Sequence, residues 1–356
     1  MSEDVRPVRA GEELNWARVA AYLRDQLAPH RIPGLDLSRE PVVEQFHGGH
    51  SNLTYLLRYQ DAELVLRRPP LGPLPPTAHN MAREHRWLDA IHPLFPLAPR
   101  TFLLCEDPEV AGAPFYVMER RHGLVVRTDE PPALADRPAA RHRLSQALVE
   151  TLADLHAIAI EANGLSHLGK PVGFVERQVR GWTERWHRSK TDEIPEMAAL
   201  ATWLAAHLPP NADPPAIVHG DFKLDNVMLD PHDVGRLVAV FDWEMTALGD
   251  PLVDLGIFLA YWSQGAKLAP HDALASVTNR PGWFSRAEVI ECYAARSGRD
   301  LSRLAFYEAF ALFKIAVVIQ QIYFRYQNGQ TRDERFAQFD VRVLQLARQG
   351  AAAAAG

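Results

Sequence analysis

The chain has 356 residues, of which 47% are hydrophobic and 23% charged, and this length and composition predict a folded globular protein with room for two lobes. The net charge of -6 offers no basic surface of the kind that binds nucleic acid or anionic membrane, so we expect neither partner. The two cysteines, Cys105 and Cys292, lack metal-ligand spacing and predict neither a zinc site nor a disulfide framework.

The first residues, Met-Ser-Glu-Asp, do not show the basic and then apolar order of a signal peptide. The sequence also contains no uninterrupted run of about 18 apolar residues, the length that spans a bilayer. We therefore expect a protein of the reducing cytoplasm.

The first third of the chain has the pattern of a small antiparallel sheet. Apolar residues at helical spacing predict a leading amphipathic helix over residues 13–27. Short apolar runs then predict strands at 42–46, 55–59, 63–68, 101–105 and 115–119. The proline-rich stretch 69–76 predicts a loop, because proline lacks the backbone donor, and a helix should follow over residues 78–91.

The rest of the chain is mainly helical in pattern. Helical spacing predicts helices at 141–160, 174–188, 196–208, 287–296 and 304–326, and we expect the alanine-rich end of the chain to fray. We therefore predict an α+β protein with a strand-rich N-lobe at residues 1–121 and a larger helical C-lobe at residues 122–356.

A catalytic motif follows the short strand 216–218. It reads His219-Gly-Asp221-Phe-Lys223-Leu-Asp-Asn226, and Asp242 ends a later apolar strand. Phosphoryl transfer needs a carboxylate that orients a hydroxyl and oxygen ligands that hold Mg²⁺ against a nucleotide. We predict Asp221 as the base and Asn226 and Asp242 as metal ligands, with Lys223 reaching the transferring phosphoryl group. Each piece alone is more often a turn or a helix cap, but short strands enter and leave this loop.

The motifs together resemble the aminoglycoside phosphotransferase-like kinases, which share the bilobal fold of protein kinases and choline kinases. Phe46-His-Gly-Gly-His-Ser-Asn-Leu-Thr-Tyr55, Val65-Leu-Arg-Arg68 and Asp242-Trp-Glu-Met-Thr-Ala-Leu-Gly-Asp250 are most similar to the kinase-like domain found ahead of some acyl-CoA dehydrogenases. The resemblance implies ATP and Mg²⁺ as cofactors, a small-molecule hydroxyl as acceptor and a functional link to an acyl-CoA dehydrogenase. ATP and GTP both remain open.

Several residues of the predicted N-lobe are candidates for nucleotide binding. Gly48 and Gly49 let the backbone approach phosphate closely, and Ser51 and Asn52 add polar donors, although a glycine pair is also typical of a simple hairpin turn. Strand alternation places Arg67 on the same face as Val65, which would lie beneath the adenine. The alternative for Arg67 and Arg68 is a pair of solvated surface arginines.

The resemblance implies three further contacts. Glu84 corresponds to the helical glutamate that forms an ion pair with a strand lysine in kinases, a position at which this chain has Arg67. Phe115-Tyr-Val-Met118-Glu119-Arg-Arg121 is similar to the hinge between lobes, where Met118 would line the adenine pocket and the backbone of Glu119 and Arg121 would meet the adenine edge. Asp250 and Asp254 are expected as helix caps or loop anchors.

The acceptor is less determined by the sequence. The helix predicted over 304–326 carries Lys314 and Arg325 against the single acid Glu308, which disfavours a polycationic aminoglycoside. Trp182 and Trp186 share a helical face and suit either core packing or a quaternary amine. By resemblance, a hydroxyacyl-CoA-like acceptor is preferred. A kinase of choline-like or sugar alcohols, and a nucleotide-binding regulatory module without turnover, are the alternatives.

Overall fold

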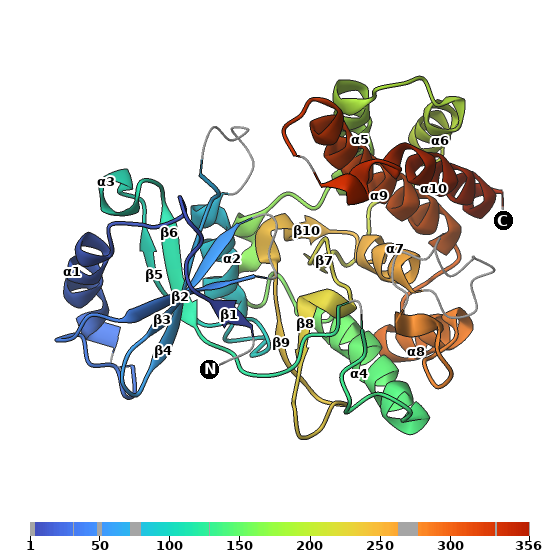
Figure 1. Cartoon of the computed structure of the whole chain (residues 1–356). Coiled ribbons are helices and arrows are strands. Elements are labelled where there is room, and N and C mark those ends of the chain that lie inside the picture. Colours follow the sequence, from blue (N-terminus) through green and yellow to red (C-terminus); the bar gives the residue numbers. More distant parts are fainter. Residues whose placement is uncertain are drawn as a thin grey trace. The chain divides into compact units, whose positions relative to one another are not determined.

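The computed structural model describes residues 4–30, 32–47, 52–71, 80–127, 129–262, 277–331 and 333–355 (Figure 1). The chain forms two compact units, which we describe separately. The small unit comprises Met1–Gly123 and Val238–Glu244, and the large unit comprises Leu124–Leu237 and Met245–Gly356. The lobes expected at 1–121 and 122–356 stay predictions, because a grouping by contacts does not test which segments fold independently.

The described strands of the small unit form one antiparallel sheet in the order β1-β2-β3-β4-β6-β5. The strands are β1 (Val5–Arg6), β2 (Val42–Phe46), β3 (Leu53–Arg58), β4 (Glu63–Arg68), β5 (Thr101–Cys105) and β6 (Phe115–Glu119). Leu64 and Leu66 of β4 enter the core of the unit, so Val65 and Arg67 lie on the opposite face. The side chains of Val65 and Arg67, which are predicted to contact the nucleotide, therefore point away from the core of the unit.

The helices of the small unit pack on this sheet. They are α1 (Trp16–Leu27), α2 (Met81–Ile91) and the short α3 (Pro108–Ala111), with a 3₁₀ turn at Ala28–His30. Val19, Leu23 and Leu27 bury the apolar stripe of α1 in the sheet core. The helix starts at Trp16 and not at residue 13, because Asn15 caps it by accepting a hydrogen bond from the Arg18 N–H. α2 packs on β5 and β6.

The large unit is built mainly from helices (Figure 1). They are α4 (Pro138–His156), α5 (Phe174–Ser189), α6 (Pro195–Ala206), α7 (Leu252–Tyr261), α8 (Arg286–Ser297), α9 (Leu304–Gln327) and α10 (Phe339–Ala354), with 3₁₀ turns at Leu165–Leu168, Leu224–Asn226, Val277–Asn279 and Glu334–Phe336. The short strands β7 (Ala216–Val218) and β10 (Ala247–Gly249) pair antiparallel. β8 (Val227–Leu229) and β9 (Leu237–Val240) form another two-stranded sheet, and the chain passes into the small unit within β9. A 3₁₀ turn at Trp243–Met245 follows.

Two expectations for the helices of the large unit were also wrong. The alanine-rich end of the chain was expected to fray, but residues 351–354 continue α10, whose earlier residues Val343, Leu346 and Ala347 are buried where the helix packs on α9 and α6. α4 ends at His156 and not at residue 160. Ile160 continues the apolar pattern, but it is buried from a loop, so periodicity alone misplaced the helix end.

α9 is a core helix of the large unit. Ala309, Phe310, Phe313, Ala316 and Val317 are fully buried, and α5, α7 and α10 pack around the helix. Its length and composition alone would suit a membrane span, but about two-thirds of its apolar window (67%) is buried inside the structure. That burial is typical of an internal helix of a folded protein. A lysine, Lys314, is unusual in such a helix because its charge is buried.

Candidate active site

The loop after β7 is fixed through its backbone. Asp254 at the start of α7 is fully buried, and its two oxygens accept the His219 N–H at 2.6 Å and the Gly220 N–H at 2.7 Å. Its carboxylate also contacts His156 Nε2 at 3.2 Å. Burial raises the pKa of Asp254, but the hydrogen bonds from His156 and the loop outweigh this effect and lower it overall. Asp254 is therefore the anchor of this loop.

Gly220 cannot be replaced without strain. Its φ of +86° lies in the left-handed region, and a Cβ atom here would lie 2.8 Å from Met245 Cβ and 3.0 Å from the Met245 carbonyl oxygen. The Asp221 N–H in turn donates to His219 Nδ1 at 3.2 Å. These contacts fix the main chain immediately before the predicted base.

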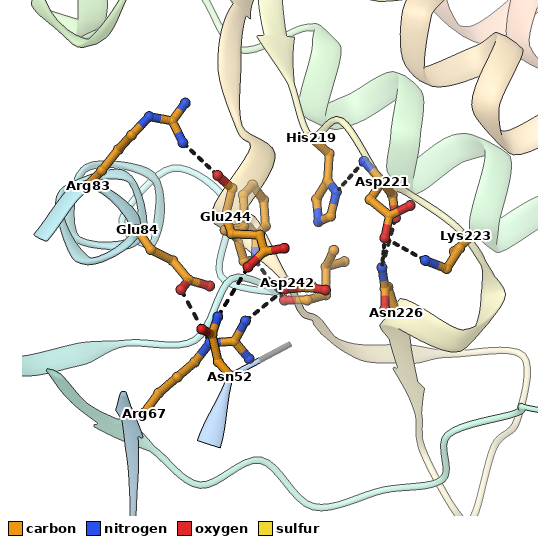
Figure 2. Close-up of polar contacts among 12 residues, drawn as sticks. Asn52, Arg67, Arg83, Glu84, His219, Asp221, Lys223, Asn226, Asp242 and Glu244 are labelled. Atoms are coloured by element: carbon orange, nitrogen blue, oxygen red, sulfur yellow. Dashed lines mark hydrogen bonds and ion pairs between the residues drawn. The ribbon is translucent and has the colours of Figure 1, made fainter. Parts of the chain in front are cut away.

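The 3₁₀ turn Leu224–Asn226 returns the chain to Asp221 (Figure 2). Asn226 Nδ2 donates to the Asp221 carbonyl oxygen and to Asp221 Oδ2, both at 2.9 Å, and Lys223 Nζ lies 2.5 Å from Asp221 Oδ2. The Asp221 side chain retains 23% of its exposure. The five-residue spacing thus brings a carboxylate, an ammonium and an amide together, and the orientation of Asn226 turns its amide oxygen away from Asp221.

Lys223 is held as a cation. Burial alone would lower its pKa, but Asp221, Tyr261 and Asp225 raise it above the ordinary value. Its Nζ lies 3.8 Å from Asp225 Oδ1 and 5.3 Å from the centre of the Tyr261 ring. Burial raises the pKa of Asp225, against the charge of Lys223. The loop therefore carries a permanent positive charge beside the Asp221 carboxylate.

A separate polar group lies in the small unit around Arg67 (Figure 2). Arg67 Nε lies 3.2 Å from Glu84 Oε2, and Arg67 Nη2 lies 2.7 Å from Asp242 Oδ1. The ion pair expected between Arg67 and Glu84 is present, and the Arg67 side chain is only 15% exposed. Burial raises the pKa of Glu84 despite the neighbouring guanidinium. The surface alternative for Arg67 and Arg68 was wrong, because Arg68 is also buried and donates to the Ala111 carbonyl oxygen at 2.6 Å.

Glu244 joins this group and was missed by sequence reasoning. Asn52 Nδ2 donates to Glu244 Oε2 at 3.1 Å, and Arg83 Nη1 donates to the Glu244 carbonyl oxygen at 2.6 Å. Burial and the adjacent Asp242 raise the pKa of Glu244 to about 7. The only available signal was a second acid two residues after Asp242. Asp242 itself has a left-handed φ of 66°, a strained conformation that clusters at functional sites.

The predicted hinge is only partly available to an adenine. Met118 is buried in β6 opposite Val65 of β4. The Glu119 N–H donates to the Arg100 carbonyl oxygen at 2.9 Å, so this N–H is already engaged. That the backbone of Glu119 and Arg121 meets the adenine edge stays a prediction. The Arg121 side chain is engaged by Glu119 Oε1 at 2.8 Å and by the Pro96 carbonyl oxygen at 2.8 Å. The Arg121 side chain is thus already bonded within the protein, so a contact of Arg121 with a nucleotide would use its backbone.

The profile of the phosphotransferase enzyme family matches residues 42–289, which is more than half of the chain. The chain belongs to this family.

Relatives of this chain and solved structures of similar proteins agree with that placement. Acyl-CoA dehydrogenase family member 11 of Rattus norvegicus is 35% identical over 339 residues, covering 94% of this chain and 42% of its own length. The chain therefore spans less than half of that relative. A structure from Ralstonia eutropha, itself only provisionally assigned as an aminoglycoside phosphotransferase, has a TM-score of 0.80 at 30% identity and covers 96% of this chain and 98% of its own.

A more distant structure extends the likeness of fold. An aminoglycoside phosphotransferase solved with AMP-PNP and hygromycin B has a TM-score of 0.56 at 16% identity and covers 87% of this chain and 94% of its own. With the antiparallel sheet and the helical unit described above, these likenesses establish the α+β, protein-kinase-like fold of the phosphotransferase.

Most of the predicted polar site residues fall into two described groups. Asp221, Lys223 and Asn226 contact one another in the large unit, and Asn52, Arg67, Glu84 and Asp242 lie in the small-unit group. Gly48, Gly49 and Ser51 lie outside the described residues. That Asp221, Asn226 and Asp242 meet around one metal ion stays a prediction.

The donor set fits magnesium in its chemistry. Mg²⁺ prefers oxygen ligands and shares them with substrate phosphates, so one amide and one carboxylate suffice on the protein side. Asn226 Nδ2 is committed to Asp221, which directs the amide oxygen elsewhere, and the Asp242 carboxylate retains 29% exposure. Within the described ranges, no group of three His, Cys, Asp or Glu side chains is placed to hold a metal.

Proposed function

We propose that this phosphotransferase moves the γ-phosphoryl group of ATP, with Mg²⁺, to a hydroxyl group of a small molecule, and that the acceptor is a hydroxylated acyl thioester of the hydroxyacyl-CoA type. The observation that carries the proposal is Asp221, a partly exposed carboxylate on a loop whose backbone is fixed on both sides. A base held in this way pre-organises the acceptor hydroxyl, which is the main protein contribution to phosphoryl transfer.

Each side chain has a distinct part in this reaction. Asp221 orients the acceptor hydroxyl and takes its proton, and the Lys223 ammonium stabilises negative charge on the transferring group. Asn226 and Asp242 would hold Mg²⁺, which when bound neutralises charge on the nucleotide phosphates. Arg67 presents a planar guanidinium that can grip phosphate in a bidentate manner.

A small cavity beside the catalytic loop has room for only part of an acceptor, but its lining bears on the acceptor class. It has a volume of about 70 Å³, and its lining includes Lys223, Asp225, Arg127, Phe258, Tyr261 and Trp262. Aromatic walls with two cations and one acid suit an apolar group attached to an anion better than a polycation. The relatives whose names denote acyl-CoA dehydrogenases support the same acceptor class, and a functional link to such an enzyme is part of the proposal.

The tryptophan pair disfavours a choline-like acceptor. Trp182 and Trp186 are both buried, at 5% and 2% exposure. Arg185 Cζ already lies 4.6 Å from the centre of the Trp182 ring, and Lys314 Nζ lies 5.4 Å from it. The Trp182 ring is therefore occupied by the protein's own cations, and a quaternary amine would have to displace them.

Two measurements test the proposal in sequence. First, ATP with Mg²⁺ should raise the melting temperature, because a ligand that binds only the folded state stabilises it. Second, purified protein should transfer labelled phosphate from ATP to a hydroxyacyl-CoA in a panel that also contains choline, ethanolamine and sugar alcohols. Binding without transfer to any acceptor would favour the regulatory module, and transfer to choline alone would overturn the acceptor class.

A further inference from the structure

Lys314 is a buried cation in an otherwise apolar helix. It lies in the middle of α9 and is only 6% exposed, among neighbours such as Phe310, Phe313 and Val317 that are fully buried. Burying an ammonium group costs folding free energy, so packing alone would favour a methionine at this position. The cost indicates that the charge has a use in this part of the molecule.

The side chain of Lys314 ends at the catalytic loop. Its Nζ donates to the carbonyl oxygen of Gly220, 94 residues away in the sequence. That carbonyl belongs to the peptide bond between Gly220 and Asp221, and the N–H of the same bond donates to His219 Nδ1 at 3.2 Å. One peptide group, directly before the predicted base, is thus held at both its oxygen and its nitrogen.

The surroundings of Lys314 are charged on several sides. The carboxylates of Asp221 and Asp254 favour its protonated form, whereas Lys223 and Arg185 oppose it, and the face of Trp182 lies 5.4 Å from Nζ. Burial is the largest effect and lowers the pKa of Lys314 to about 8. Lys223 differs, because its carboxylate neighbours raise its pKa above the ordinary value.

We propose that Lys314 is a positioning residue of the reaction, whose buried ammonium holds the Gly220–Asp221 peptide and so keeps the Asp221 carboxylate aligned with the acceptor hydroxyl. This inference rests on the proposed function of Asp221 as the base. Lys314 does not touch the reacting atoms in this account and acts through the loop. A change at Lys314 should therefore alter turnover and leave nucleotide binding in place.

Three substitutions separate the charge from the hydrogen bond. Lys314→Gln retains a donor for the Gly220 carbonyl but removes the charge, Lys314→Met removes both, and Lys314→Arg keeps a charge that does not titrate in the working range. We expect kcat to fall about 10- to 100-fold in Lys314→Gln and Lys314→Met, as misalignment of a catalytic group does, with the Kd for ATP within about twofold of the parent value. Lys314→Arg should recover most of the lost activity. Lys170→Met, at an exposed lysine, serves as the control.

The pH profile provides a readout that a purely structural lysine would not move. The parent kcat should decline as the pH rises through about 8, where Lys314 loses its proton. Lys314→Arg should lack this decline, and Lys314→Gln should be slow throughout. Parent-like kcat and an unchanged profile in Lys314→Gln would overturn the proposal.

A measurement without turnover separates this inference from the proposed function. The chain contains only five lysines, at positions 170, 190, 223, 267 and 314, so lysines labelled with ¹³C at Cε give few NMR signals. The signal that disappears in Lys314→Arg should titrate near pH 8, while an ordinary lysine titrates at about 10.4. Loss of proton should also shift the Asp221 amide signal. If no acceptor is phosphorylated, the proposed function fails. If Lys314 titrates above pH 10, or its titration leaves the Asp221 amide unmoved, the positioning role fails.

Discussion

The catalytic loop of the large unit and the Arg67 group of the small unit are held in different ways. Buried residues from distant helices bond the loop through its backbone, with Asp254 accepting from two N–H groups and Lys314 donating to the Gly220 carbonyl. Arg67 and its partners Glu84 and Asp242 hold one another through side-chain charges. A loop fixed by its backbone keeps one geometry, whereas ion pairs can exchange partners when phosphate brings new charge.

The largest effect is expected at the residue that the fixed loop presents. Asp221→Asn removes the proton acceptor but preserves the shape of the side chain, so kcat should fall by about 10²- to 10⁴-fold, the usual contribution of general acid–base catalysis. Because the loop is held by its backbone, the ATP-dependent rise in melting temperature should remain. Steady-state kinetics and thermal shift measure the two quantities.

The matched control is Asp192→Asn, at an exposed aspartate of the large unit. It should retain the parent kcat. Normal turnover of Asp221→Asn on a confirmed acceptor would show that the base lies elsewhere.

Among the substitutions considered for stability, removal of the Asp254 carboxylate should lower the free energy of unfolding the most. Asp254→Ala leaves the buried His219 and Gly220 N–H groups without their acceptor and should lower the free energy of unfolding by about 3–5 kcal/mol, measured by urea denaturation. Asp192→Ala, at an exposed aspartate, should change it by less than about 0.5 kcal/mol. A loss as small as that of the control would mean that the loop has other support.

The same anchor gives stability a pH dependence. The folded-state pKa of Asp254 is lowered, so its contribution is complete above the unfolded-state value of about 3.9 and is lost as the pH falls through the folded-state pKa. Asp254→Asn should therefore lose less stability between pH 5 and the acid limit, roughly the range in which a carboxylate titrates. An acid limb identical to that of the parent would remove Asp254 as its cause.

The contrast between the groups also explains what the sequence could predict. The contact between Asp221 and Asn226 could be predicted because it depends on five residues of local sequence, and strand alternation placed Arg67 on the same face as Val65. That Asp242 joins Asp221 and Asn226 stays a prediction. Lys314 and Glu244 were not assigned, because their roles depend on contacts with residues 94 and 192 positions away. The sequence shows only that Lys314 interrupts an apolar run, and its contact with the Gly220 carbonyl oxygen becomes visible only in the folded chain.

Breaking the ion pairs of the small unit should cost less than removing Asp254. Arg67→Met leaves Glu84 buried without its guanidinium and should lower the free energy of unfolding by about 1–3 kcal/mol. The raised pKa of Glu84 limits the loss, since the carboxyl group can take a proton. Urea denaturation measures this change.

A double variant tests whether the unpaired carboxylate is the reason. Arg67→Met combined with Glu84→Gln should recover part of the loss, because the second change removes the unpaired carboxylate. Additive losses in the double variant would locate the effect in packing and not in charge. Arg67→Lys, which keeps a cation, should weaken ATP binding less than Arg67→Met does.

The smallest effect is expected at Asn52. Its amide can donate a hydrogen bond either to Glu244 or to a nucleotide phosphate, so the net gain in binding free energy on exchanging one for the other is small. Its amide donates to Glu244 Oε2 at 3.1 Å, so Asn52→Ala should lower the free energy of unfolding by about 0.5–1.5 kcal/mol. If the amide turns from Glu244 to a phosphate oxygen on nucleotide binding, one hydrogen bond replaces another, and the Kd for ATP should rise less than about fivefold, the value of roughly 1 kcal/mol. Calorimetric titration with ATP measures this Kd. A much larger rise in the Kd of Asn52→Ala would mean that the amide gains a new hydrogen bond on ATP binding and does not exchange one partner for another.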